Sequence, residues 1–475
     1  MSTSSVNPLS SLTDALSSSN SSSGSTNTSG AGLGQGIDVQ EFVQYAVADQ
    51  EAVITSLQSQ QSTLDSQTTE LSTIESDMSS LDTALQALSD PLGALAAQTV
   101  TSSDSGVISG TADSTASTGT HTITVSNLAT TSSYYSDEVP SDSTTVSGSL
   151  SIAVDGGTAV NVPIDASDNT TTLSGIASYI NSQSNLGVTA TVVQDANGAR
   201  LALVSNTSGA SGALTVTGSL SYQDSSGNTD TANFNLGTKG VNANLTVDGI
   251  PVSSASNTVS NVIPGVTLNL GGTSSSPVDL SVQPDNSQIT SAINNFVSAY
   301  NTVTTEINNQ FDVTSTSSGG PLEGDNTLRQ VQSMLLSAVS YSVTGNSGMV
   351  NLASMGVNMN DDGTLTVDNN TLSAALDSNP TAVVNFFQNA TTGFAQQMDN
   401  VVQSINAPST GMLALDAQGI SSTSTDLTQQ INDLQAALTT QEQELTQVYS
   451  QVNVTLQELP LLESQTSQQL ASLSS

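Results

Sequence analysis

Apolar residues recur at intervals of seven between residues 57 and 92 of the chain. From residue 71 onward, further apolar residues fill the intermediate positions, at spacings of three and four. This pattern predicts a coiled-coil helix with one narrow apolar face, because the residues between are mostly Ser, Thr, Gln, Asp and Glu. Such a helix cannot bury its seam alone and needs a partner helix. The predicted seam comprises Leu57, Leu64, Leu71, Ile74, Met78, Leu81, Leu85, Leu88 and Leu92.

A similar pattern returns near the other end of the chain. Apolar residues again follow alternating threes and fours, with Gln441 and Thr455 as polar interruptions. Pro460 is expected to end or kink this helix. We expect the first seam to pair with helices from the C-terminal half, between residues 286 and 459. The second seam comprises Leu427, Ile431, Leu434, Leu438 and Leu445, and it continues through Val448, Val452 and Leu459.

The residues between the two coiled coils follow a different period. Short alternating runs rich in β-branched residues, such as 150–154 and 188–193, are separated by Gly, Asn, Asp and Ser. Asp155-Gly156 and Asp248-Gly249 are typical of hairpin turns. The predicted fold class is therefore α+β and multidomain, with a helical coiled-coil stalk formed by both chain ends and an inserted β-rich head.

The changes of period divide the chain into five parts. The Ser-rich leader, residues 1–30, is expected to be disordered in the free chain, because it lacks apolar periodicity. N-terminal coiled-coil helices occupy 31–104, the β-rich head 105–284, a helical stalk domain with a short hairpin 285–424, and a C-terminal coiled-coil helix 425–475. We expect two small domains in the head, one from about 105–140 with 240–284 and the other from 141–239.

Composition excludes several function classes. Three basic residues stand against 41 acids, for a formal net charge of -38. Because binding to nucleic acid needs Lys and Arg, nucleic-acid partners are excluded, and an anionic membrane surface is disfavoured for the same reason. We expect no membrane insertion and no Sec-type signal peptide. The acidity suggests either work outside the cell in acidic surroundings or biased composition without adaptation.

Residues that carry chemistry are scarce. There is no Cys, and the single His, His121, has no sequence partners for a triad. Residues 358–369 partly match a calcium loop, but Asn358 and Asn369 stand where Asp and Glu are required. The many Asp residues leave a glycosidase carboxylate pair open by spacing, although 3% aromatic residues and no Trp argue against a sugar cleft. We therefore expect no enzyme activity, no cofactor and no metal.

Several motifs together resemble the flagellar filament cap protein family, also called hook-associated protein 2. They are Gly32-Leu33-Gly34-Gln35-Gly36-Ile37-Asp38 followed by Phe42-Val43, the segments 112–129 and 172–205, Leu245-Thr246-Val247-Asp248-Gly249, Ile263-Pro264-Gly265-Val266-Thr267-Leu268, Gly320-Pro321-Leu322-Glu323-Gly324-Asp325 and 352–387. The resemblance covers the chain from about residue 31, and the order of the motifs makes it specific.

The resemblance implies a non-enzymatic cap at the distal end of the bacterial flagellar filament. Such proteins are exported without a cleaved signal through the flagellar type III channel. They form a homo-oligomeric ring that retains exported flagellin and promotes its polymerisation, which motility requires. Implied partners are other copies of the chain, flagellin, hook–filament junction proteins and an export chaperone. We expect filament contacts at Phe42, Val43, Ala46 and Val47, and at Val448, Val452 and Leu459.

Two features depart from the family pattern. The leader is longer than usual, and the near absence of Lys and Arg leaves ring contacts to apolar groups, amides or protonated carboxyls. Two alternatives stay open at this point. A hook–filament junction protein also pairs terminal helices, and a secreted surface adhesin, which would make cell adhesion the function, also places a β head on a helical stalk.

Overall fold

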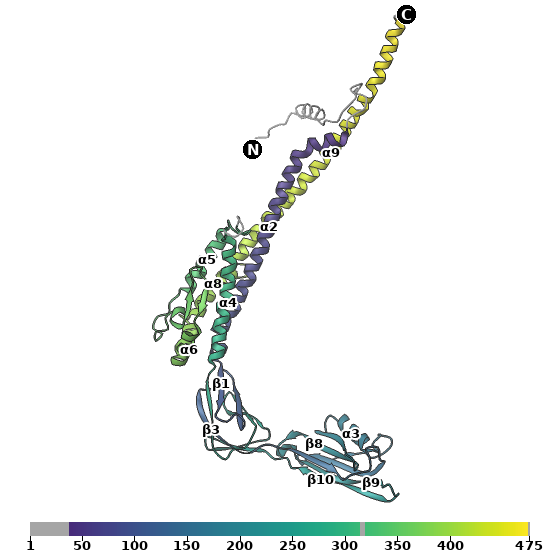
Figure 1. Ribbon diagram of the computed structural model, residues 1–475, viewed down its shortest axis with the longest axis vertical. Helices are drawn as coiled ribbons and strands as arrows, with labels where there is room; N and C mark the ends of the chain where they lie inside the picture. The colour runs from purple at the N-terminus through teal and green to yellow at the C-terminus, as the bar shows by residue number, and fades with distance from the viewer. Residues whose placement is uncertain (1–37, 314–318, 474–475) are drawn as a thin grey trace.

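A computed structural model describes residues 38–313 and 319–473 of the chain. The molecule is elongated, with long helices of both chain ends side by side and the β-rich part at the opposite end from the C-terminus (Figure 1). This arrangement confirms the predicted α+β fold class with a helical stalk and an inserted β head. The predicted leader, residues 1–30, lies outside the described residues.

The N-terminal helix α2 spans Val39–Ser89. It begins there because the Asp38 carboxylate accepts hydrogen bonds from the backbone N–H groups of Gln40 and Glu41, at 3.0 and 3.3 Å. It ends just before Pro91, whose ring cannot continue a helical ladder. Leu92 therefore lies beyond the helix and is 64% exposed, so its assignment to the seam was wrong.

The lower part of α2 packs into a helical bundle. Its partners are α4 (Asn286–Phe311), α8 (Phe394–Asn406) and the first turns of α9 (Met412–Leu473), and α5 (Asn326–Val339) closes the bundle. Phe296, Phe386 and Phe394 meet at its centre, with ring centroids 5.4–5.6 Å apart. From α2 this core contains Leu71, Ile74, Met78, Leu81, Leu85 and Leu88, each at most 1% exposed.

A smaller unit completes the bundle between α5 and α8. It contains η4 (Leu352–Met355), the hairpin β16 (Val357–Met359) and β17 (Leu365–Val367), and the helices α6 (Asn369–Ser378) and α7 (Pro380–Gln388). The calcium-like sequence forms the turn of this hairpin. Asp362 Oδ1 accepts hydrogen bonds there from Thr364 N and Oγ1, at 2.9 and 2.6 Å, which is the pattern of a tight turn.

Above the bundle, α2 and α9 continue as a two-helix coiled coil (Figure 1). Ile54, Leu427 and Ile431 are buried between them. Leu57, Leu64 and Leu438 pack against these three residues and are half-buried, as Leu445 is further along α9, while Leu434 is 38% exposed. α9 starts 13 residues before the predicted boundary at 425 and runs through Pro460 without ending. Proline has no backbone N–H, so the carbonyl one turn before Pro460 lacks its helical hydrogen bond. The helix continues because this segment is exposed and water can hydrate that carbonyl.

The first β domain joins the bundle through strands at both of its chain ends. A five-stranded sheet in the order β1-β15-β3-β11-β12 faces a three-stranded sheet, β13-β14-β2, around one apolar core. β1 pairs with β15 and belongs to this domain, although we expected the helical part to extend to residue 104. The strands are β1 (Gln98–Ser102), β2 (Ile108–Ala112), β3 (Gly119–Asn127), β11 (Ala243–Val247), β12 (Ile250–Ser254), β13 (Thr258–Ile263), β14 (Val266–Leu270) and β15 (Val278–Pro284).

The second β domain is a seven-stranded antiparallel sheet in the order β6-β5-β9-β10-β4-β8-β7, packed against helix α3 (Leu173–Ser182). Strand β4 lies between β10 and β8, so the boundary predicted at 141 was placed too late. Long-range pairing decides this membership, because β4 pairs only with strands more than 60 residues later. The strands are β4 (Thr131–Ser136), β5 (Val146–Val154), β6 (Val160–Val162), β7 (Val188–Gln194), β8 (Ala199–Ser208), β9 (Leu214–Gln223) and β10 (Thr229–Thr238).

Candidate assembly surface

The single histidine has a structural partner. His121 Nδ1 lies 2.7 Å from Asp248 Oδ2, and Asp248 Oδ1 accepts a hydrogen bond from Thr122 N at 2.9 Å. The hydrogen bond from His121 and the one from the Thr122 backbone hold the pKa of Asp248 below its usual range. Asp248 is the first residue of the β11–β12 turn, so these bonds tie that turn to β3. The contact of His121 with Asp248 therefore has a structural role in this turn.

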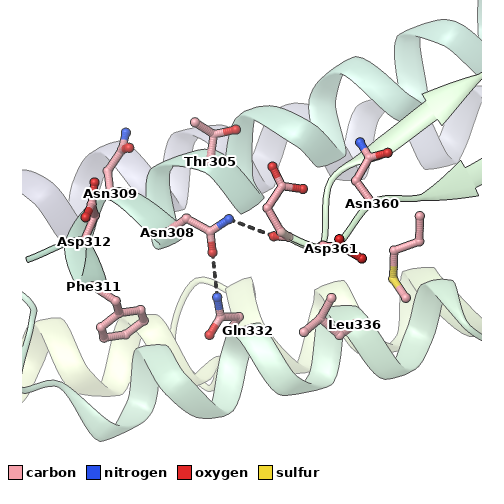
Figure 2. A pocket seen from close by; sticks show the side chains of 12 residues that line it. Thr305, Asn308, Asn309, Phe311, Asp312, Gln332, Leu336, Asn360 and Asp361 are labelled. Carbon is pink, nitrogen blue, oxygen red and sulfur yellow. Dashed lines mark hydrogen bonds between the residues drawn. The ribbon is translucent and has the colours of Figure 1, made fainter. Parts of the chain in front are cut away.

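A surface hollow lies beside the β16–β17 hairpin (Figure 2). Hydrogen bonds join the residues that line it: Asn308 Nδ2 donates to the backbone carbonyl oxygen of Asp362 at 2.9 Å, and Gln332 Nε2 donates to Asn308 Oδ1 at 2.7 Å. These amides connect α4, α5 and the hairpin. Among residues 38–313 and 319–473, no group of three or more His, Cys, Asp or Glu side chains could hold a metal ion. The hydrogen bonds in the hollow hold the small unit against α4 and α5.

The distal part of α9 carries an exposed apolar face. Val448, Val452 and Leu459 are 55%, 43% and 44% exposed, at the spacing of four and seven that continues the second seam. In Figure 1 this end of α9 extends beyond the start of α2. Within the described ranges, 38–313 and 319–473, no second helix buries these three apolar side chains, although a coiled-coil seam requires one. Further exposed apolar residues follow there, which the sequence reading did not single out: Val454, Leu461, Leu462 and Leu470.

The start of α2 is already paired within the chain. Val43 and Val47 are buried, and the Phe42 ring lies 6.0 Å from the Tyr449 ring of α9. We expected filament contacts at Phe42, Val43, Ala46 and Val47, but Val43 and Val47 are buried within the chain. The buried face of α2 continues upstream of Leu57 through Ile54, Val47 and Val43. Ala46 is exposed, and its neighbour Tyr45 is 66% exposed.

The distal half of α9 carries negative charge only. Residues 412–473 contain no Lys or Arg, whereas Glu442, Glu444, Glu458 and Glu463 lie along the distal half of α9. This charge favours a partner helix that carries Lys or Arg beside its apolar face, because repulsion disfavours another strongly acidic surface. In the part of the chain that the structure describes, no helix is long and apolar enough to cross a membrane.

The fold and this surface define the class of the protein: an elongated stalk-and-head structural protein whose last helix exposes apolar side chains along its distal end. Comparison with known proteins makes the assignment specific. The profile described as "Flagellar hook-associated protein 2 N-terminus" matches residues 35–132, and the one described as "Flagellar hook-associated protein 2 C-terminus" matches residues 240–460. The "Flagellin hook IN motif" matches residues 149–207, within the second β domain.

Curated relatives and a solved structure agree with these profiles. The B-type flagellar hook-associated protein 2 of Pseudomonas aeruginosa is 31% identical over 73% of this chain and 78% of its own length. Flagellar hook-associated protein 2 of Escherichia coli is 29% identical over 92% of this chain and 97% of its own. The crystal structure of the Escherichia coli flagellar cap protein superposes with a TM-score of 0.56 and 27% identity, covering 74% of this chain and 99% of that one. The chain belongs to the flagellar hook-associated protein 2 family.

Proposed function

We propose that the chain is a non-enzymatic structural cap at the distal end of the bacterial flagellar filament. In this role, copies of the chain form a ring that retains exported flagellin and promotes its polymerisation. Membership of a family whose solved relative is a flagellar cap protein supports the role. The observation that carries it is the exposed apolar face of α9, since apolar side chains exposed at heptad spacing can pack against a further helix.

The proposed contacts lie on the distal end of α9. Val448, Val452 and Leu459 would bury their side chains against terminal helices of flagellin or of neighbouring copies. Complete burial of one Val or Leu side chain contributes about 1.5–3 kcal/mol, so three such residues can hold a subunit at the filament end without any covalent step. No chemistry is needed, because the cap acts by occupying the growing end while a subunit folds beneath it.

At the start of α2, the structure leaves fewer residues available for filament contacts than the sequence predicted. Val43 and Val47 stabilise the α2–α9 coiled coil, and Phe42 contacts Tyr449, so these three fix the direction in which α9 leaves the stalk. Ala46, together with Tyr45, is the part of this region that stays available to a partner. The stalk in turn holds the β domains away from the contact surface (Figure 1).

The proposed location is outside the cell, at the filament tip, after export through the flagellar type III channel without a cleaved signal. Proposed partners are flagellin and other copies of the chain, with contacts to hook–filament junction proteins and an export chaperone along the way. The two alternatives, a junction protein and a surface adhesin, are disfavoured by the two family profiles and by the cap structure. Labelling the protein on intact cells separates the three, because each predicts a different position: filament tip, hook junction or cell envelope.

Deletion of residues 447–475 tests the proposed role. This deletion removes the exposed face and leaves the packing of Leu427 and Ile431 on Ile54 intact. We expect a folded, exported protein that fails to support filament growth in cells lacking the endogenous protein. The matched control replaces the exposed Ser450 and Gln451 with Ala and keeps the apolar face. Full motility of the deletion strain would contradict the proposal.

A further inference from the structure

Carboxyl groups face each other across three helix–helix contacts of the bundle. In the first, Glu70 of α2 and Glu306 of α4 share one amide: Gln310 Nε2 donates to Glu70 Oε1 at 2.9 Å and to Glu306 Oε1 at 3.2 Å. A single amide nitrogen bonded to both side chains brings the two carboxyl groups into the same small space. Asp77, two turns further along α2, also faces Glu306.

The other two contacts also place two carboxyl groups near each other, without a shared amide. Asp82 of α2 faces Asp399 of α8, and Asp82 accepts hydrogen bonds from Gln403 Nε2 at 3.2 Å and from Gln86 Nε2 at 3.0 Å. In the third, Asp416 of α9 faces Asp325, the residue that caps α5.

Asp416 shows most clearly that these contacts need a hydrogen-bond donor. Its Oδ2 atom is buried and has no hydrogen-bond donor. The nearby carboxyl of Asp325 can donate to it only when a proton lies between the two groups. A buried acceptor without a donor destabilises the folded state, and the proton removes that cost.

No basic side chain neutralises these groups. Arg329 is the only Lys or Arg in residues 285–475, and residues 1–97 contain none. The guanidinium of Arg329 donates to Glu323 O at 2.9 Å and lies 4.3 Å from the centre of the Phe311 ring. Apart from Asp77, an acid that faces Glu306, the other side chains that face the pairs are neutral: Gln310, Gln86, Gln403 and Thr327.

The pKa values shift in the direction that this geometry requires. The hydrogen bond with Glu306, burial and the Glu306 charge together raise the pKa of Glu70 to about 7. Burial and then the Asp325 carboxyl raise the pKa of Asp416 to about 6. The pKa of Asp82 is raised mainly by burial and further by the Asp399 carboxyl. The pKa of Asp77 is raised mainly by burial and further by the charge of Glu306.

We propose that shared protons stabilise the helical bundle. One proton is held between the two carboxyl groups of each of the pairs Glu70–Glu306, Asp82–Asp399 and Asp325–Asp416. These protons join α2 to α4, α2 to α8, and α5 to α9. A folded-state pKa above the ordinary value means that the folded chain binds more protons, so its stability rises as the pH falls. The pH range over which stability rises runs from about 7 down to 4.5 for Glu70, and from about 6 down to 3.8 for Asp416. This inference concerns the stability of the stalk and is independent of the proposed cap role.

Urea unfolding of the full chain, followed by helical circular dichroism at several pH values between 7.5 and 5.0, tests the proposal. We expect the urea midpoint of the helical signal to rise as the pH falls. The triple variant Glu70→Gln, Asp82→Asn, Asp416→Asn should unfold at higher urea than the unsubstituted chain at pH 7.5 and should lose most of the pH dependence. The control variant Asp49→Asn, Glu51→Gln, Asp65→Asn removes the same charge from exposed positions of α2 and should keep the dependence.

A midpoint that stays level or falls on acidification would overturn the proposal, as would equal behaviour of the two triple variants. A second measurement covers the case in which the triple variant does not fold. Carbon-13 NMR titration of the Glu70 carboxyl in the unsubstituted chain should give a midpoint near 7, and Glu306→Gln should lower that midpoint. An unchanged midpoint in Glu306→Gln would exclude the shared proton.

Discussion

At the scale of single residues, burial depends on where a helix ends as much as on the heptad pattern. Leu88 and Leu92 occupy consecutive places in the predicted seam, yet Leu88 is fully buried and Leu92 is 64% exposed. The difference arises because α2 ends at Ser89, before Pro91. The pattern of the sequence indicated Pro91 as the end of the helix, but it could not show that the chain then leaves the bundle.

This pair of leucines gives a matched test of the bundle core. Leu88→Ala should destabilise the chain by about 2–5 kcal/mol, because it leaves a cavity among packed helices. Leu92→Ala removes the same atoms from an exposed turn and should change the free energy of unfolding by less than about 0.5 kcal/mol. Urea unfolding of both variants measures the difference. Equal losses would mean that the chain does not end α2 at Ser89.

At the scale of elements, the periods of three-and-four and of two predicted which stretches form helices and strands. The partners of those elements did not follow from the same patterns. The α2 seam meets α4, α8 and α9 in turn, and this choice depends on the shapes of distant helices rather than on local spacing. The pairing of Phe42 with Tyr449 was missed for the same reason, since the two residues are more than 400 positions apart. The only sequence signal was the upstream continuation of the α2 seam through Ile54, Val47 and Val43.

The turn carboxylates of the β domains respond to acid in the opposite direction from the carboxyl pairs of the bundle, and so do Asp362 and Asp368 of the small unit, whose pKa values are also lowered. Hydrogen bonds from nearby Ser, Thr and Asn side chains and from backbone N–H groups lower the pKa values of turn and loop carboxylates. A lowered folded-state pKa contributes stability above the ordinary value of 3.8, and this stability is lost as the pH falls through the lowered pKa values. The group comprises Asp113, Asp137, Asp165, Asp195 and Asp224.

We therefore expect the β domains to open before the stalk below pH 3.8. Pepsin digestion at pH 4.5 and pH 2.0, corrected for the activity of the enzyme, measures this order through mass spectrometry of the released peptides. Early peptides at pH 2.0 should come from residues 105–284, and the bundle should be cut later. Simultaneous release from both regions at pH 2.0 would show that the turn carboxylates do not control acid stability. Loss of the whole fold by pH 4 would also contradict the suggestion of work in acidic surroundings.

At the scale of the whole molecule, the order of elements along the chain predicted the stalk and the head correctly. Both chain ends carry heptads, so the head had to lie between them, and the structure confirms this arrangement. The filament contacts predicted at the two chain ends lie in different surroundings. Val448, Val452 and Leu459 are exposed, and their contact with the filament stays a prediction, whereas Val43 and Val47 are buried in the chain's own coiled coil. The sequence pattern alone cannot separate these cases, because a heptad position looks the same whether its partner is in the chain or outside it.

The central claim is that the distal face of α9 contacts other subunits at the end of the filament. The chain contains no Cys, so a single Val452→Cys substitution offers one site for a thiol-linked photo-crosslinker. On isolated filaments we expect this site to form adducts with flagellin or with a second copy of the chain. The matched site Val193→Cys, an exposed valine on β7, should form fewer. Filaments that contain the protein and give no adduct from position 452 would contradict the account.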